Sequence, residues 1–368
     1  VREWTTDASV PLRSFAVCSD TQVGKRRQFK DDIAEIDILD LAFPATTDAA
    51  KLAEGVADAS AGRMTVVFAT YQSIQVVSDA QSAHGLPAFD LIICDEAHRT
   101  TGATLDGQAE SNFVRVHRNE TIKGKKRLYM TATPRIFGDS AKSKADDLGI
   151  TLATMDDESL FGPTLFYRGF GWAVQEGLLT DYKVIVLAMD EKLVAKSVQK
   201  RIEDPTSGLI LDDATRILGC YKALTKVDIA SDLGADTQPM RRALAFCRDI
   251  ASSQLVEREF ADVVTDYLAD DEVIETEADI AKHRLNCEIR HVDGTFNAKT
   301  RGELLDWLKA ETEENTCRIL TNARCLSEGV DVPALDAIMF LHPRKSQIDV
   351  VQSVGRVMRR APGKRMGY

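Results

Sequence analysis

Short apolar runs recur along the chain, separated by longer segments of mixed polarity. We expect strands at residues 15–18, 64–69, 91–94, 242–247, 287–292, 318–322 and 337–341, of which 15–18, 91–94 and 337–341 are wholly apolar. Short apolar runs bounded by polar residues are typical of strands in a parallel sheet, whose two faces are both covered. The intervening segments are long enough for helical crossovers. The pattern therefore predicts an α/β fold with parallel sheets.

The order of these elements predicts two domains. A chain of 368 residues has the length of two ordinary domains. We expect residues 1–138 to form the first domain and residues 182–368 the second. Residues 139–181, which lose the periodicity, are the expected connector. Residues 190–236 are amphipathic, are split by Pro205 and Gly208, and are expected to be a helical insertion rather than core.

Residues 91–94 are followed at once by Asp95, Glu96 and His98. The run is short enough for a strand that is buried on both faces. Ligands of open parallel sheets bind just past the carboxyl ends of the strands. A carboxylate such as Asp95 can hold Mg²⁺, and Glu96 could orient or deprotonate a water molecule. The competing interpretation is a solvated turn that carries ordinary surface carboxylates.

Two further segments make the catalytic interpretation stronger. Thr131 and Thr133 follow another short apolar strand, residues 127–130. Much later, Gln352, Arg356 and Arg359 lie on a predicted helix over residues 347–360. Arg356 and Arg359 are three positions apart, so they share a helix face. A pair of structural salt bridges is the alternative role for these arginines.

These segments, in this order, resemble motifs II, III and VI of superfamily 2 helicases and translocases. The matching residues are 95–98 (Asp-Glu-Ala-His), 131–134 and 352–360. The amino-acid sequence of residues 91–102 and 127–135 is similar to the helicase segment of single-chain type ISP restriction-modification enzymes. The resemblance covers nearly the whole chain. It implies two RecA-like parallel-sheet domains, the first of them incomplete at its N-terminus.

The resemblance also implies an ATP- and Mg²⁺-dependent motor. In the family, ATP lies between the two domains. Asp95 would hold Mg²⁺, and Glu96 would align the attacking water. Arg356 and Arg359 would reach the γ-phosphate as arginine fingers, with Gln352 on the same face. The residues that would couple the nucleotide to the nucleic acid are His98, Thr131 and Thr133.

Other motifs of the family are matched by turns after strands. Thr70 and Gln72 correspond to motif Ib, which contacts the nucleic acid backbone, and Gly294 and Thr295 form a second such turn. The nucleotide-binding residues of motif V correspond to Gly329 and Asp331. Thr70 and Thr295 could instead be helix N-caps, Thr295 for a helix over residues 298–310.

The sequence departs from the family pattern in one respect. It contains no G-x-x-x-x-G-K-[ST] phosphate loop, and Gly24-Lys25 lacks the required context. We therefore expect weak or absent ATP hydrolysis by residues 1–368 alone. Because the chain starts at Val1, we expect the loop to lie upstream in a parent polypeptide. In the type ISP enzymes a nuclease precedes the helicase and a methyltransferase follows it, and neither signature is found here.

Composition narrows the possible partners. The net charge of −11 argues against a broadly basic surface, although local clusters such as residues 123–127 could contact phosphates. The cysteines show no C-x-x-C spacing, so neither a zinc site nor a disulfide framework is indicated. No apolar run reaches the length of a membrane span, and a cytoplasmic protein is expected. The resemblance to the type ISP enzymes implies double-stranded DNA as the favoured partner. The alternatives are a stand-alone RNA or DNA helicase and a non-hydrolysing nucleic-acid-binding remnant.

Overall fold

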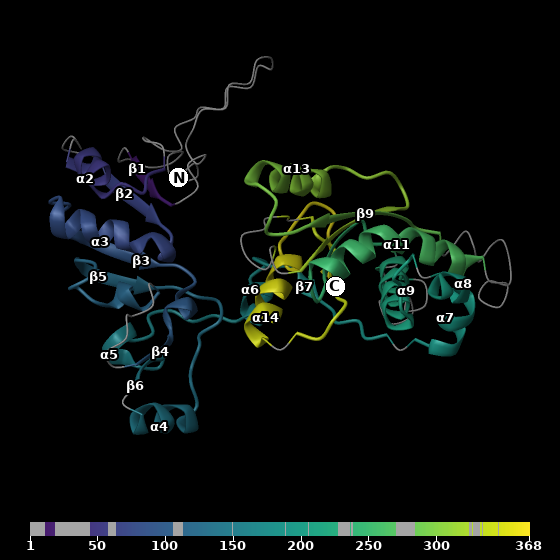
Figure 1. Cartoon of the computed structure of the whole chain (residues 1–368), viewed down its shortest axis with the longest axis horizontal. Helices are drawn as coiled ribbons and strands as arrows, with labels where there is room; N and C mark the ends of the chain where they lie inside the picture. The colour runs from purple at the N-terminus through teal and green to yellow at the C-terminus, as the bar shows by residue number, and fades with distance from the viewer. Residues whose placement is uncertain are drawn as a thin grey trace, which may run out of the picture. The chain divides into compact units, whose positions relative to one another are not determined.

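The computed structural model separates the chain into two compact units, residues Val1–Leu165 and Phe166–Tyr368 (Figure 1). The boundary falls inside the segment that was expected to be a connector. The described residues are 12–18, 45–57, 64–105, 113–148, 150–187, 189–204, 206–226, 236, 238–269, 284–323, 326, 332, 334–344 and 346–368. Within these ranges, no helix combines the length and apolarity needed to cross a bilayer.

The first unit is built on two parallel strand pairs and one antiparallel pair. Its strands are β1 (Leu12–Val17), β2 (Met64–Ala69), β3 (Phe89–Cys94), β4 (Gly102–Leu105), β5 (Gly124–Tyr129) and β6 (Ile150–Ala153). Its helices are α2 (Ala49–Ala57), α3 (Ile74–Ala83), α4 (Asp139–Asp147) and α5 (Glu158–Phe161), with short 3-10 turns η1 (Tyr71–Ser73), η2 (Ala97–Thr100) and η3 (Val114–His117). Strand β1 pairs with β2 and β3 with β5, both in parallel, whereas β4 and β6 are antiparallel.

The core of the first unit lies on one face of these strands. Helices α2 and α3 supply Leu52 and Val77, which pack with Cys94 at the end of β3. The other face of β3 is different, because the side chains of Leu91 and Ile93 are 49% and 56% exposed. Our prediction that this strand is buried on both faces is therefore wrong. Successive side chains of a strand point to opposite faces, and no described helix covers this one.

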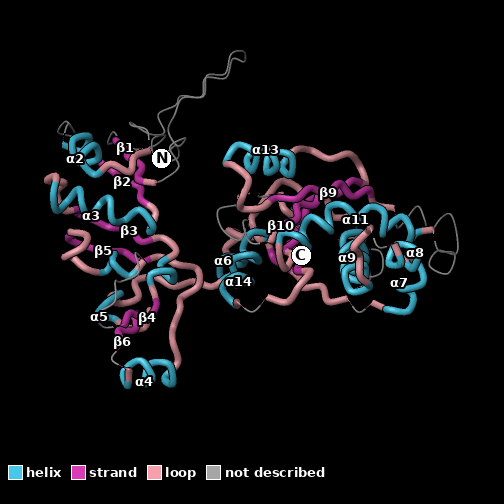
Figure 2. Tube along the Cα trace, viewed as in Figure 1, coloured by secondary structure: helices cyan, strands magenta, loops and turns pink. Residues whose placement is uncertain are grey.

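The second unit contains a four-stranded parallel sheet in the order β11-β8-β10-β9. Its strands are β7 (Asp181–Tyr182), β8 (Arg242–Phe246), β9 (Asn286–Val292), β10 (Thr316–Asn322), β11 (Ala337–Phe340) and β12 (Met366–Gly367). Its helices are α6 (Phe170–Gln175), α7 (Glu191–Ser197), α8 (Gln199–Glu203), α9 (Leu211–Thr225), α11 (Ile250–Leu268), α13 (Ala298–Lys309) and α14 (Gln347–Val357) (Figure 2). The α/β class with parallel sheets is thus confirmed.

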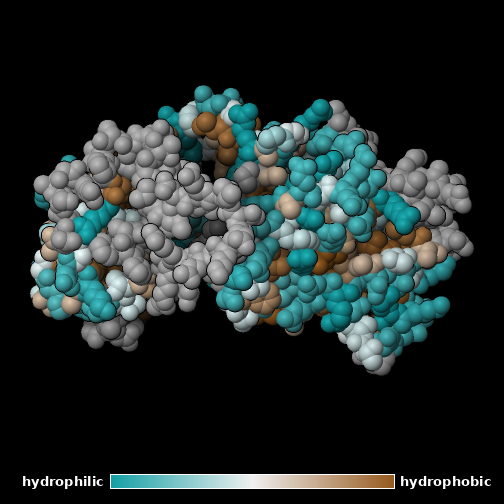
Figure 3. Space-filling view, turned by 90° about the horizontal axis from the view of Figure 1, so that it is seen from above, coloured by the Kyte–Doolittle hydropathy of each residue, from teal (hydrophilic) through white to brown (hydrophobic). Residues whose placement is uncertain are grey.

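Both faces of this sheet are covered, because successive residues of β8 pack alternately into two different hydrophobic clusters. Ala243 and Ala245 pack with residues of α9 and α11, whereas Leu244 and Phe246 pack with residues of α13 and α14. Full burial of a side chain such as Leu244 contributes roughly 1.5–3 kcal/mol relative to exposure. The sheet is therefore a rigid support, and the turns that follow its strands are held in place by it. Hydrophilic residues cover most of the visible surface of this unit, interrupted by a hydrophobic band (Figure 3).

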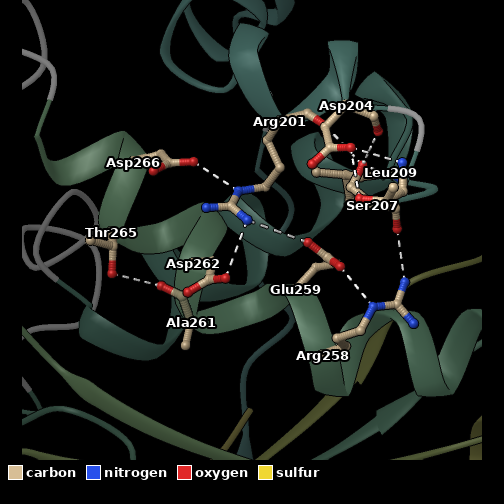
Figure 4. A network of polar contacts seen from close by, with 11 residues as sticks. Arg201, Asp204, Ser207, Leu209, Arg258, Glu259, Ala261, Asp262, Thr265 and Asp266 are labelled. Atoms are coloured by element: carbon tan, nitrogen blue, oxygen red, sulfur yellow. Dashed lines mark hydrogen bonds and ion pairs between the residues drawn. The ribbon is translucent and has the colours of Figure 1, made fainter.

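The segment expected to be an insertion forms helices α7, α8 and α9, and it is part of the core. Residues Ile217 and Tyr221 of α9 are fully buried against α11 and the sheet. Arg201 of α8 is anchored on α11, where its guanidinium lies 2.8 Å from Asp266 and 3.2 Å from Asp262 (Figure 4). The helical prediction for this segment agrees with the structure, but its separation from the core does not.

The short strand β7 pairs with β12 in parallel. One predicted helix boundary differs from the structure. Helix α14 ends at Val357, so Arg359 lies in the turn beyond it rather than inside the helix.

Candidate functional site

The acidic pair lies where strand β3 ends. The Asp95 side chain is exposed, and one of its carboxylate oxygens accepts a 2.9 Å hydrogen bond from the amide of Glu96. Glu96 itself has φ 49° and ψ 45°, in the left-handed region that residues other than glycine rarely adopt. Such backbone strain persists only where the surroundings hold it, and it gathers at functional sites. The turn thus projects two carboxylates from the carboxyl end of a strand.

His98 joins this turn to the segment after β5. Its Nδ1 lies 2.9 Å from the Thr131 hydroxyl and 3.3 Å from the Glu96 carboxylate. The hydroxyl of Thr133 is 3.5 Å from the same nitrogen, and the Thr133 amide donates to the Thr131 hydroxyl at 3.1 Å. His98 and Thr133 are buried. His98 thus contacts both the Glu96 carboxylate and the threonine segment.

Asp95 fits a magnesium site of the kind that nucleotides complete. Mg²⁺ prefers oxygen ligands and is usually held by one or two carboxylates together with substrate phosphates and water. The exposed Asp95 carboxylate at the end of β3 can supply one such ligand. Bound Mg²⁺ would contribute charge that neutralises phosphate oxygens.

The turn after β2 contains Thr70 and Gln72. Thr70 is at the N-cap position of η1, but its side chain does not cap the turn, and its hydroxyl instead donates to the Ser73 hydroxyl at 3.1 Å. Thr70 therefore occupies the N-cap position without making the side-chain hydrogen bond that an N-cap residue usually makes. Gln72 is exposed. Between the two, Tyr71 donates a 2.8 Å hydrogen bond to the main-chain oxygen of Asp95.

The basic cluster on β5 includes an ion pair with the neighbouring strand. Lys125 pairs with Asp90 of β3 at 2.6 Å, and both side chains are largely exposed. The hydrogen bond between the two side chains, together with their opposite charges, raises the pKa of Lys125 and lowers that of Asp90. Exposed pairs of this kind contribute little to stability. Lys125 therefore belongs to an exposed ion pair between β5 and β3.

In the second unit, one of the two predicted arginines lies on α14 and the other lies just after it. Arg356 is in the last turn of the helix and is buried, and Gln352 is one turn earlier and half-buried. Arg359 is half-buried in the turn after the helix. The predicted nucleotide contacts Gly329 and Asp331 lie outside the described residues.

The turn after β9 is held by a buried polar network. The Ser253 hydroxyl lies 2.7 Å from His291 Nδ1, and His291 Nε2 lies 2.9 Å from the Asp293 carboxylate. Asp293 also accepts from the amide and the hydroxyl of Thr295, at 2.7 and 2.6 Å. Thr295 is therefore not the cap of α13. That cap is Asn297, whose side chain accepts from the Thr300 amide at 2.9 Å.

This network makes stability depend on pH. Hydrogen bonds from Thr295 and His291 lower the pKa of Asp293 from 3.8 to about 2. The Asp293 carboxylate therefore stabilises the fold fully above pH 4, and this contribution is lost as the pH falls through 2. We expect Asp293→Asn to unfold at lower urea concentration than the wild type at pH 7. The difference between the two should narrow below pH 4. A carboxyl carbon of Asp293 that titrates near its ordinary value in NMR would contradict this prediction.

Sequence reasoning missed Tyr71, Ser253 and His291 as members of these networks. For Tyr71, the one sequence signal was its place between the predicted contact residues Thr70 and Gln72. Ser253 lies inside α11, and nothing in its neighbourhood indicated a partner on β9.

Two protein families match the chain. "Type III restriction enzyme, res subunit" matches residues 27–136, and "Helicase conserved C-terminal domain" matches residues 225–361. Among the curated relatives, the "Probable helicase A859L" of African swine fever virus (isolate Tick/Malawi/Lil 20-1/1983) is 28% identical over 315 residues. That alignment covers 84% of the chain and 28% of the viral protein.

Two solved structures of restriction enzymes are also similar. The ATP-dependent type ISP restriction-modification enzyme LlaBIII, bound to DNA, is 41% identical, with a TM-score of 0.77 over 100% of the chain. A nuclease-deletion mutant of the type ISP enzyme LlaGI, in complex with a DNA substrate mimic, is 33% identical, with a TM-score of 0.58 over 99% of the chain. The chain spans 23% and 21% of these two proteins.

Proposed function

The chain belongs to superfamily 2 of the helicases and translocases, with its two RecA-like domains similar to those of type ISP restriction-modification enzymes, and from this we propose that it is the ATP-driven motor of a DNA translocase. The observation that carries the proposal is the contact of His98 with both Glu96 and Thr131. It joins a carboxylate that can activate water to a segment that can respond to its movement.

The reaction that this site suits is hydrolysis of a nucleoside triphosphate. Asp95 would hold Mg²⁺, Glu96 would align the attacking water, and Arg356 and Arg359 would stabilise charge on the γ-phosphate. Gln352 would bond to the phosphate or to the water. Phosphoryl transfer needs mainly positioning and charge stabilisation, and these side chains offer both. Gly329 and Asp331 are proposed to contact the nucleotide.

The nucleic acid would lie against turns that follow strands. Thr70 and Gln72 after β2, and Gly294 and Thr295 after β9, carry hydroxyl, amide and main-chain groups that suit phosphate oxygens. Gln72, Gly294 and Thr295 are exposed. The DNA-bound state of LlaBIII and the DNA mimic bound to LlaGI support DNA over RNA as the partner.

A comparison of nucleic acids tests the partner. We expect ATP hydrolysis by the natural polypeptide that contains residues 1–368 to be stimulated by double-stranded DNA and much less by RNA of the same length. Stimulation by RNA alone would favour a stand-alone RNA helicase. Absence of hydrolysis with every nucleic acid would favour a non-hydrolysing remnant.

We also propose that the chain works beside nuclease and methyltransferase modules, because it spans less than a quarter of LlaBIII. Sequencing the source DNA on both sides of this reading frame tests the proposal. In-frame segments that encode a G-x-x-x-x-G-K-[ST] loop and the two modules are expected. A flanking stop codon with none of them would contradict it.

A further inference from the structure

Tyr71 connects the turn after β2 with the acidic pair after β3. Its hydroxyl donates a 2.8 Å hydrogen bond to the main-chain oxygen of Asp95, which is 24 positions later in the sequence. Its ring packs against Phe113 at a centroid distance of 5.4 Å. The hydroxyl is thus the polar end of a ring that is otherwise held by packing.

The position of this hydrogen bond matters because of the peptide group that it contacts. The main-chain oxygen of Asp95 and the amide of Glu96 belong to the same planar unit. Tyr71 holds the oxygen of that unit, and the Asp95 carboxylate holds its amide at 2.9 Å. The plane is therefore fixed at both ends, and its orientation sets the φ angle of Glu96. This explains how Glu96 keeps φ at 49° without being glycine.

We propose that Tyr71 is a positioning residue that transmits nucleic acid binding at the Thr70–Ser73 turn to the Asp95–Glu96 peptide. A phosphate backbone that moves this turn also moves the Tyr71 hydroxyl, and with it the plane that aims Asp95 and Glu96. The inference rests on the proposed function, because it requires that the turn contacts nucleic acid. It adds a route within the first unit, separate from the contact between His98 and Thr131.

Hydrogen exchange tests this route directly in the 368-residue chain, without requiring hydrolysis. Double-stranded DNA should slow amide exchange in a peptide covering residues 70–74 and also in a peptide covering residues 89–98. In Tyr71→Phe the first effect should remain, and the second should fall by about five-fold or more, the lower end of measured couplings between sites. Affinity for DNA should stay within about two-fold of the wild type, because the variant keeps the ring.

Tyr129→Phe is the matched control. It also removes a hydroxyl from a half-buried ring of the first unit, one that lies 2.7 Å from His117 Nδ1. If Tyr71→Phe acted only by removing a structural hydrogen bond, Tyr129→Phe should lose the response of residues 89–98 to DNA as well. We expect Tyr129→Phe to keep that response.

The remaining outcomes overturn the proposal in distinguishable ways. If DNA slows both peptides equally in the wild type and in Tyr71→Phe, Tyr71 is not the link. If the response is lost equally in both variants, the effect of Tyr71 is structural. If DNA slows neither peptide in the wild type, the proposed contact of the turn with DNA fails, and the inference falls with it.

Discussion

Glu96→Gln is expected to lower ATP turnover by two to four orders of magnitude, the usual contribution of a positioned general base. The amide keeps the size of the side chain but cannot accept a proton from water. Its oxygen can still face His98, so the turn should keep its shape. Affinities for ATP and DNA should therefore change by about three-fold or less, since neither ligand needs the carboxylate for binding. Steady-state and single-turnover hydrolysis by the natural polypeptide that contains this chain would measure the effect.

The control for this variant is Glu54→Gln. Glu54 is an exposed carboxylate on α2, outside the turns that carry the candidate site. Its replacement should leave turnover unchanged. Turnover of Glu96→Gln within about three-fold of the wild type would show that Glu96 does not act on the water.

Arg359→Ala is expected to lower ATP turnover by about three orders of magnitude or more, which is the measured range for arginine fingers. Arg359→Lys should recover only part of this loss. Lysine keeps the charge but lacks the planar fork that contacts two phosphate oxygens at once. Because Arg359 is half-buried in the turn after α14, its replacement should not unfold the helix. Turnover and thermal unfolding would be measured on the same preparations.

The neighbouring Arg360 offers a matched control. It is exposed, and it donates a hydrogen bond to the main-chain oxygen of Gly177 within the second unit. Arg360→Ala removes the same positive charge one position along, so a general electrostatic effect would appear in both variants. Equal losses in Arg359→Ala and Arg360→Ala would contradict a specific role for Arg359.

The strand ends were the most predictable part of the site. Short apolar runs placed Asp95 and Thr131 after parallel strands, and parallel strands bring their carboxyl ends to one edge. This reasoning is enough to expect Glu96, His98 and Thr131 near one another, as the structure has them. The exposure of one face of β3 was not predictable in the same way. It depends on which elements cover Leu91 and Ile93, and a strand's own sequence does not specify them.

The side-chain networks could not be predicted from local sequence. Thr295 has the residue type of a helix cap, but the carboxylate of Asp293 two positions earlier takes its hydroxyl and amide. Asn297, nearer the start of α13, caps the helix instead. The partners of Ser253 and Tyr71 are tens of positions away and become neighbours only after the sheets form. Such contacts follow from tertiary packing, which propensities do not encode.

The most direct measurement of the proposed function is displacement of a DNA triplex by the natural polypeptide that contains this chain. A motor that moves along double-stranded DNA removes a third strand placed on its path, after a lag that grows linearly with the distance to be travelled. We expect this lag with ATP and Mg²⁺, and its loss in Glu96→Gln. ATP hydrolysis without displacement at any distance, or displacement with no dependence on ATP, would contradict the assignment of a DNA translocase.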